Sequence, residues 1–173
     1  MYSNLSDSFV SSSYPFKLIF MPKVTILPFR PDLARHFKSI SKIWLEELFS
    51  LEPFDLRQLE SPEETIIQSG GAIIFAQLDG EIVGTVALYK SGETTFEMIK
   101  MGVLPAAQGK GIGMLLAENI IEKAKEMGGK KLILYSNTKL KAALKIYEKL
   151  GFTPVIPEGG KYSRCDVKME MNI

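Results

Sequence analysis

The chain has 173 residues, which is enough for one domain with a hydrophobic core. Its 46% hydrophobic and 24% charged residues are ordinary for a globular protein, and 21 basic against 20 acidic side chains give a formal net charge of +1. This balance argues against a protein dominated by nucleic-acid electrostatics, the single cysteine excludes an intrachain disulfide, and no apolar run is long enough to span a membrane. We therefore expect a cytoplasmic protein with no nucleic-acid and no membrane partner.

The first 21 residues differ in composition from the rest of the chain. They are rich in serine and lack the basic start of a signal peptide. We expect a disordered leader at 1–21, either as a genuine tail or as a product of gene calling with Met21 as the true start. Residues 22–173 are expected to form a single domain.

The first half of this domain predicts a strand, two helical segments and an antiparallel meander. The alternating, β-rich residues 23–29 form the first strand, and a helix opens at Arg30-Pro31-Asp32 with proline in its first turn. A second helix begins at Ser61-Pro62 and ends at Gly70-Gly71. Tight turns then connect three strands, at 72–78, 82–89 and 94–103.

The aromatic and acidic stretch from Trp44 to Asp55 has two interpretations. It can be a helix end that packs on the core. It can also be one wall of an acceptor pocket, where carboxylates and aromatic rings would suit a cationic amine.

The second half predicts a helical crossover followed by further strands. An amphipathic helix ends at Gly128-Gly129, and the short apolar strand 131–135 suits a central, parallel position. Ser136-Asn137-Thr138 can cap the next helix. After Gly151, the pattern predicts final strands at 152–156 and 164–171, with a loop at 157–160 between them.

A glycine-rich turn joins strand 94–103 to the helix after it. Gly109, Gly111 and Gly113 let a ligand approach the backbone closely. The N–H groups at a helix start lack intrahelical partners and carry the positive end of the dipole, which suits a phosphate or pyrophosphate. On these glycines alone, a plain strand–helix turn remains an alternative.

Two motifs together are more specific than the glycines. Gln108, Gly111 and Gly113 fit the pattern Q/R-x-x-G-x-G/A, and Tyr147-Glu148-Lys149-Leu150-Gly151-Phe152 follows an alanine-rich helix. The chain resembles the GCN5-related N-acetyltransferase (GNAT) family from Val24 to Met171, most densely from Glu97 to Phe152. The resemblance implies an α/β (α+β) fold with a mixed, centrally splayed sheet flanked by helices, and one N-acetyltransferase domain over 22–173.

The resemblance also implies a reaction. Acetyl-CoA would be the acyl-donor cosubstrate, with the acetyl group moving directly to a primary amine of a small molecule or peptide and no metal involved. Many members carry asparagine seven residues before the tyrosine, where this chain has Leu140, and Asn137 is the expected substitute. The cofactor-binding residues implied by the family are Met101, Gly102, Val103, Gln108, Gly109, Lys110, Gly111, Ile112, Gly113, Asn137 and Tyr147.

Tyr147 and Glu97 are the catalytic residues that the resemblance implies. Tyr147 occupies the position near the CoA sulfur, where a protonated phenol can act as general acid; the alternative is packing on an apolar helix stripe. Glu97 matches the strand position of the general base in some histone-acetylating members; the alternatives are a salt bridge or an exposed position. Strand alternation predicts that Glu97 shares a face with Ile99, Met101 and Val103.

Two other functions stay open. A non-catalytic acyl-CoA-binding sensor or interaction module could use the same fold, although the presence of both Glu97 and Tyr147 argues against it. A nucleotide or dinucleotide binder is disfavoured, because the turn lacks the Walker lysine-serine/threonine pair and the Rossmann spacing. The assembly is also open, with a homodimer as one alternative.

Overall fold

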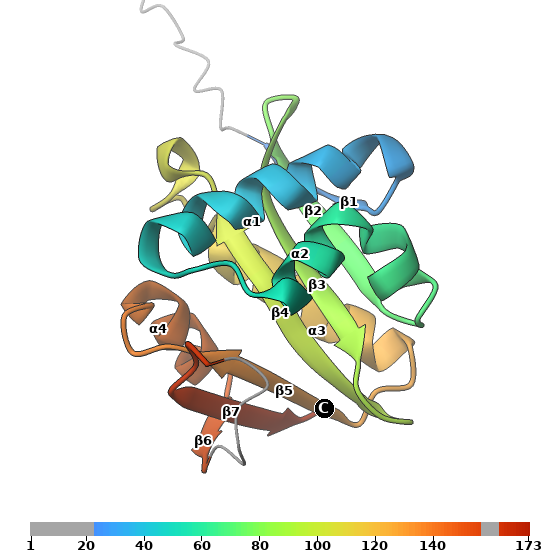
Figure 1. Ribbon diagram of the computed structural model, residues 1–173, viewed down its shortest axis with the longest axis vertical. Helices are drawn as coiled ribbons and strands as arrows, with labels where there is room; N and C mark the ends of the chain where they lie inside the picture. Colours follow the sequence, from blue (N-terminus) through green and yellow to red (C-terminus); the bar gives the residue numbers. More distant parts are fainter. Residues whose placement is uncertain (1–22, 157–162) are drawn as a thin grey trace, which may run out of the picture.

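The computed structural model describes residues 23–156 and 163–173, so the leader expected at 1–21 and the loop expected at 157–160 lie outside the described residues. Within them, seven strands form one mixed sheet in the order β1-β2-β3-β4-β5-β7-β6 (Figure 1). The expected α/β fold is confirmed. The strands are β1 (Val24–Pro28), β2 (Ala72–Leu78), β3 (Glu81–Lys90), β4 (Thr95–Val103), β5 (Lys131–Ser136), β6 (Thr153–Val155) and β7 (Val167–Asn172).

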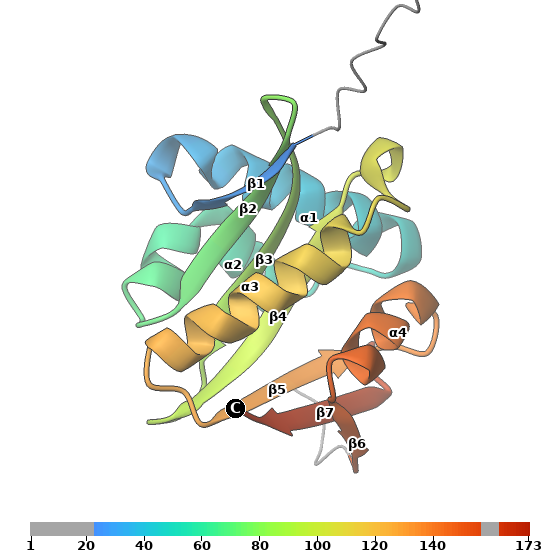
Figure 2. The ribbon, with the colours of Figure 1, turned by 180° about the vertical axis from the view of Figure 1, so that it is seen from behind.

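Helices cover both faces of the sheet. The helices α1 (Ala34–Leu48) and α2 (Pro53–Glu60) lie on one face, and α3 (Ile112–Glu126) lies on the other (Figures 1 and 2). The helix α4 (Lys141–Lys149) follows β5. Apolar side chains from the two faces form two separate cores, one under α1 and α2 and one under α3. The burial of these faces is the main stabilisation of a fold of this kind.

The sheet is split between β4 and β5. These strands are parallel, and their pairing is limited to three rungs, from Thr95 opposite Lys131 to Glu97 opposite Ile133. Beyond Glu97 the two strands run apart, and each makes its remaining ladder with its other neighbour. A central splay of the sheet was expected, and it opens on the side where both strands end.

A bulge interrupts β4 shortly after the last of these rungs. Ala87 of β3 pairs with Ile99, and Thr85 pairs with Gly102, so two β4 residues lie opposite one β3 residue. Lys100, the first of the two, adopts a φ of +54°, which is rare for a side-chain-bearing residue.

The bulge changes which side chains of β4 share a face. Ile99 packs in the core under α1 and α2, whereas Met101 and Val103 pack in the core under α3. Glu97 lies two residues before Ile99 in regular strand and therefore shares its face. The prediction that Glu97, Ile99, Met101 and Val103 all share one face was wrong, because strict alternation ends at Lys100.

The segment after α1 also differs from the prediction. The helix α2 was not expected, although Glu52, Pro53 and Asp55 form a capping box with proline in the first turn. The helix expected from Ser61 is a single π-helical turn at Glu63–Ile67. The capping box is a local sequence signal for the start of α2.

The predicted helix cap at Ser136-Asn137-Thr138 and the predicted start of the last strand at residue 164 were both wrong. Leu140 directly precedes α4 and provides no side-chain cap. Thr138 instead donates to Asp166 through its N–H and its hydroxyl, at 2.8 Å each. The closing strand begins at Val167, so Cys165 lies in the turn before it.

Candidate active site

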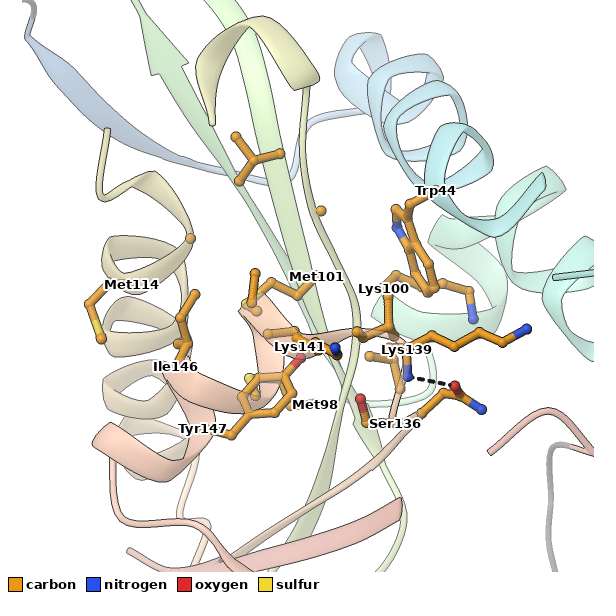
Figure 3. Close-up of a pocket in the computed structure, with 18 of the residues that line it drawn as sticks. Trp44, Met98, Lys100, Met101, Met114, Ser136, Lys139, Lys141, Ile146 and Tyr147 are labelled. Atoms are coloured by element: carbon orange, nitrogen blue, oxygen red, sulfur yellow. Dashed lines mark hydrogen bonds between the residues drawn. The ribbon is translucent and has the colours of Figure 1, made fainter. Parts of the chain in front are cut away.

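A cavity of about 680 Å³ lies where β4 and β5 separate. Its walls come from the glycine-rich turn and α3, from both strands, from α4, from α1 and from the turn before β7 (Figure 3). This volume is in the range of pockets that bury a cofactor-sized ligand. The expected site residues other than Lys110 line it: Glu97, Met101, Gly102, Val103, Gln108, Gly109, Gly111, Ile112, Gly113, Asn137 and Tyr147.

The glycine-rich turn presents bare backbone to one end of this cavity. Gly111 is the residue before α3, and it has a φ of +77°, while Gly109 has a φ of +74°. A Cβ atom placed on either glycine would meet no atom within 4 Å. The Gln108 side chain donates a hydrogen bond of 3.0 Å to the carbonyl of Val103, which ties the turn to the end of β4. The start of α3 therefore combines open space with helix N–H groups, as an anion site requires.

Gly113 is different from the two glycines before it. It lies inside the first turn of α3, and a Cβ atom there would come within 3.0 Å of the Ile146 Cδ1 atom on α4. The absence of a side chain at this position is therefore explained by the close packing of α3 against α4.

Replacing Gly111 with valine is expected to weaken acetyl-CoA binding by roughly tenfold or more, because the side chain would enter the open space in front of the helix start and oppose the positive φ. Gly128→Val is the matched control, since Gly128 has a φ of +80° and equally open surroundings at the other end of α3. Calorimetry and thermal melts should show a similar loss of stability in both variants but a loss of affinity only in Gly111→Val. Equal affinities of the two variants for acetyl-CoA would show that the turn is not the anion site.

Tyr147 reaches the cavity from α4. The residue is 8% exposed, and its ring packs edge-on against Phe152 with a centroid separation of 5.8 Å. The hydroxyl end of the ring points into the cavity (Figure 3). Burial raises the pKa of Tyr147 above its ordinary value, so the phenol keeps its proton throughout the neutral pH range.

Glu97 lies at the opening between the two strands. The residue is 1% exposed and lines the cavity, and its partner in the last parallel rung is Ile133. The carboxylate is therefore on the α1 and α2 face of the sheet, whereas Met101 and Tyr147 belong to the α3 side. The cavity connects the two faces through the gap.

Asn137 lines the cavity and also holds the surrounding loops together. Its Nδ2 atom donates to the carbonyl oxygen of Arg164 at 2.6 Å, and its Oδ1 atom accepts from the N–H of Lys139 at 2.9 Å. Contact of this amide with the pantetheine arm stays a prediction.

Ser136 was expected only as part of a helix cap. It ends β5, is 4% exposed, and its hydroxyl has no hydrogen-bond partner among the described residues. Figure 3 shows the hydroxyl pointing from the end of β5 into the cavity.

Asp55 is the centre of a buried charged cluster that the sequence did not reveal. The Lys100 Nζ atom donates to its Oδ1 atom at 2.8 Å, and the Arg164 guanidinium donates to both carboxylate oxygens at 2.7 and 2.9 Å. The Asp55 side chain is fully buried. Burial acts to raise the pKa of Asp55, but Lys100 and Arg164 outweigh it and hold the pKa below its ordinary value. Burial lowers the pKa of Lys100, and Asp55 opposes that shift.

The stretch from Trp44 to Asp55 combines features of both interpretations. Trp44 and Phe49 line the cavity, and a Cβ atom on Gly102 would come within 3.0 Å of the Trp44 ring, so glycine allows α1 to approach β4 closely. The carboxylates of the stretch do not line the cavity.

Two kinds of structure are absent from the described part of the chain. Its histidine, cysteine, aspartate and glutamate side chains form no group of three or more that could hold a metal ion. Its helices include none that is both long and apolar enough to cross a membrane.

Comparison with known proteins places these features in a family. The acetyltransferase (GNAT) family model matches residues 37–152. The uncharacterized N-acetyltransferase YjgM of Escherichia coli is 36% identical over 107 residues, which are 60% of this chain and 64% of that protein. The uncharacterized N-acetyltransferase YvbK of Bacillus subtilis is 30% identical over 114 residues, which are 64% of this chain and 74% of that protein.

Solved structures show the same fold. A GNAT acetyltransferase from Staphylococcus aureus Mu50 has a TM-score of 0.77 at 20% identity, over 87% of this chain and 99% of that one. The PaiA N-acetyltransferase of Thermoplasma acidophilum, solved with coenzyme A, has a TM-score of 0.69 at 17% identity, over 87% of this chain and 99% of that one. With two motifs, a splayed sheet and a family match over most of the domain, this chain belongs to the acetyltransferase (GNAT) family.

Proposed function

We propose that the protein transfers the acetyl group of acetyl-CoA to a primary amine of a small molecule or peptide. The observation that carries the proposal is that one cavity joins the start of α3 on one side of the sheet to Glu97 on the other. A donor and an acceptor can therefore enter from opposite faces and meet in the gap between β4 and β5.

The α3 side of the cavity fits coenzyme A. The open backbone at Gly109 and Gly111 and the helix start suit a pyrophosphate, and Lys141 and Lys149 of α4 line the same cavity with positive charge. The similarly folded PaiA was solved with coenzyme A, and YncA of Salmonella typhimurium was solved with acetyl-CoA. Bound acetyl-CoA would supply an activated acyl thioester.

The end of β4 can polarise the acyl carbonyl. The pairing with β5 stops at Glu97, so the backbone of Met101, Gly102 and Val103 does not pair with β5 on that side of the strand. Fixed N–H donors of this kind stabilise negative charge that develops on an oxygen during acyl transfer.

Glu97 and Tyr147 supply the two proton transfers. An alkyl ammonium has a pKa near ~10 and must lose a proton before its nitrogen can attack. Glu97, which lines the cavity, would accept that proton directly or through one water. The buried Tyr147 phenol holds a proton that it can give to the departing sulfur.

Thiol release from acetyl-CoA in the presence of a panel of primary amines tests the proposal. Amine-dependent release, with the acetylated amine identified by mass spectrometry, is the expected result. Binding of acetyl-CoA without release for any amine would favour the acyl-CoA sensor. Binding of ATP or NAD in place of acetyl-CoA would favour the nucleotide binder.

Glu97→Gln keeps the shape of the side chain and removes the base. At neutral pH we expect kcat to fall by roughly 10²-fold, and much of the loss should return at high pH, where the acceptor amine is already deprotonated. Rates measured across the pH range check this. Glu93→Gln, in the exposed turn before β4, is the matched control.

A different pattern would show a different role for Glu97. A raised acceptor KM with kcat kept at saturation would indicate binding alone. If neither parameter changes, Glu97 is a structural residue of the strand.

A further inference from the structure

The acceptor side of the cavity has few carboxylates. Among the described residues that line the cavity, Glu97 is the only acidic side chain. Glu46 forms an exposed ion pair with Lys42 at 3.1 Å, and Glu47 is exposed. The acidic residues near the end of α1 therefore do not form the anionic wall that a cationic amine would need.

Three cationic side chains line this side instead. Lys100 comes from the β4 bulge, Lys139 from the loop after β5, and Arg164 from the turn before β7. Lys100 and Arg164 are neighbours, because both donate to the same Asp55 oxygen, at 2.8 and 2.9 Å. The side chains of Lys100 and Lys139 extend in the same direction on the Trp44 side of the cavity (Figure 3). The Asn137 amide bridges the backbones of Lys139 and Arg164.

The counter-ions of this cluster lie behind the cations. Asp55 is fully buried and does not line the cavity. Glu52 also does not line it; its Oε1 atom accepts from the N–H and hydroxyl of Ser163, at 3.0 and 2.9 Å, and lies 3.5 Å from Arg164 Nη1. These contacts hold the guanidinium in one place, so little side-chain entropy is lost when a ligand meets it.

We propose that the acceptor is an amine that also carries a carboxylate, as an amino acid does, and that Arg164 and Lys139 recognise this carboxylate. The proposal rests on the acetyl transfer proposed above. The formal charges of Lys100, Lys139 and Arg164 balance those of Glu52, Asp55 and Glu97. A zwitterion preserves that balance, with its ammonium beside Glu97 and its carboxylate beside the cations. Guanidinium is well suited to carboxylate, which it binds through planar, charge-assisted hydrogen bonds.

The test compares acceptors that differ only in this group. Amino acids, including β- and γ-amino acids, are each paired with their primary amide and with a diamine of similar length, and kcat/KM is measured by thiol release. The amine of the amide is less basic, so a larger fraction of it is deprotonated at neutral pH. In the absence of recognition by the protein, kcat/KM should therefore be higher for the amide than for the acid. We expect the acid to be preferred by roughly 10- to 100-fold in at least one pair, through KM, as a charge-assisted hydrogen bond implies.

Substitutions test which residues cause the preference for the acid over its amide. Lys139→Gln and Arg164→Gln should raise KM for the acid and leave KM for its amide nearly unchanged. Lys145→Gln, on an exposed part of α4 outside the cavity, should change neither. Lys139 is exposed, so Lys139→Gln should fold normally even if the loss of Arg164 disturbs the Asp55 cluster.

The outcomes separate this inference from the proposed function. Transfer that favours amides or diamines over acids, or an acid preference that survives both substitutions, would overturn the inference and leave acetyl transfer standing. No thiol release with any acceptor would overturn acetyl transfer and the inference with it.

Discussion

Tyr147→Phe is expected to lower kcat by roughly 10²–10⁴-fold and to leave the affinity for acetyl-CoA almost unchanged. The substitution keeps the ring that packs against Phe152 and removes only the hydroxyl that points into the cavity. Because burial raises the pKa of this phenol, its proton is present over the whole neutral range, and the variant should lose activity at every pH in that range. This behaviour differs from that of Glu97→Gln, which high pH should rescue.

Steady-state thiol release and calorimetry on the same preparations would check this result. Tyr89→Phe is the matched control, since Tyr89 lies on β3 outside the cavity and packs edge-on against Phe54. Normal turnover in Tyr147→Phe would show that Tyr147 only packs. Another proton donor would then have to be sought, and the Ser136 hydroxyl at the end of β5, which lines the cavity, is one alternative.

Asp55→Ala is expected to lower the free energy of unfolding by about 3–5 kcal/mol, because it leaves Lys100 buried without the carboxylate that neutralises it. Arg164 loses both of its hydrogen bonds to the same group. Urea unfolding followed by circular dichroism measures the change. The control is Asp32→Ala, which breaks an arginine–aspartate pair that is exposed on the surface and should cost far less.

The double variant Asp55→Leu with Lys100→Met separates the charge from the packing. It removes the buried carboxylate together with the buried ammonium and leaves Arg164 beside Glu52. A large part of the lost stability should return if the cost in Asp55→Ala comes mainly from the uncompensated charge of Lys100. A double variant as unstable as Asp55→Ala would contradict this explanation.

The pH dependence of stability should follow from the same cluster. The pKa of Asp55 in the folded protein is below its ordinary value, so its carboxylate contributes stability above the pKa of an unfolded aspartate. That contribution should be lost as the pH falls through the folded pKa. Asp55→Asn should therefore be less stable than the wild type at neutral pH, and the gap should narrow in acid.

The sequence by itself determined the elements and residues that depend on local pattern. Period-2 runs and tight turns predicted the meander, and the apolar run at 131–135 predicted a central parallel strand, which the structure has at Lys131–Ser136. Positive φ angles at Gly109 and Gly111 are a local backbone requirement, so the turn before α3 could be found from its glycines. Glu97 and Tyr147 were named from the resemblance to the family; both line the cavity, and their catalytic roles stay predictions.

Only the tertiary structure decided what surrounds those residues. The bulge at Lys100 depends on how β4 pairs with β3, and it put Met101 and Glu97 on opposite faces of the sheet. Asp55 meets Lys100 and Arg164 across 45 and 109 residues of sequence. Charges so far apart in the chain are brought together by the order of the strands and the packing of the helices. Neither can be derived from the spacing of apolar residues within one element. As a result, Asp55 is a buried counter-ion and does not line the cavity, whereas Lys100, Lys139 and Arg164 do.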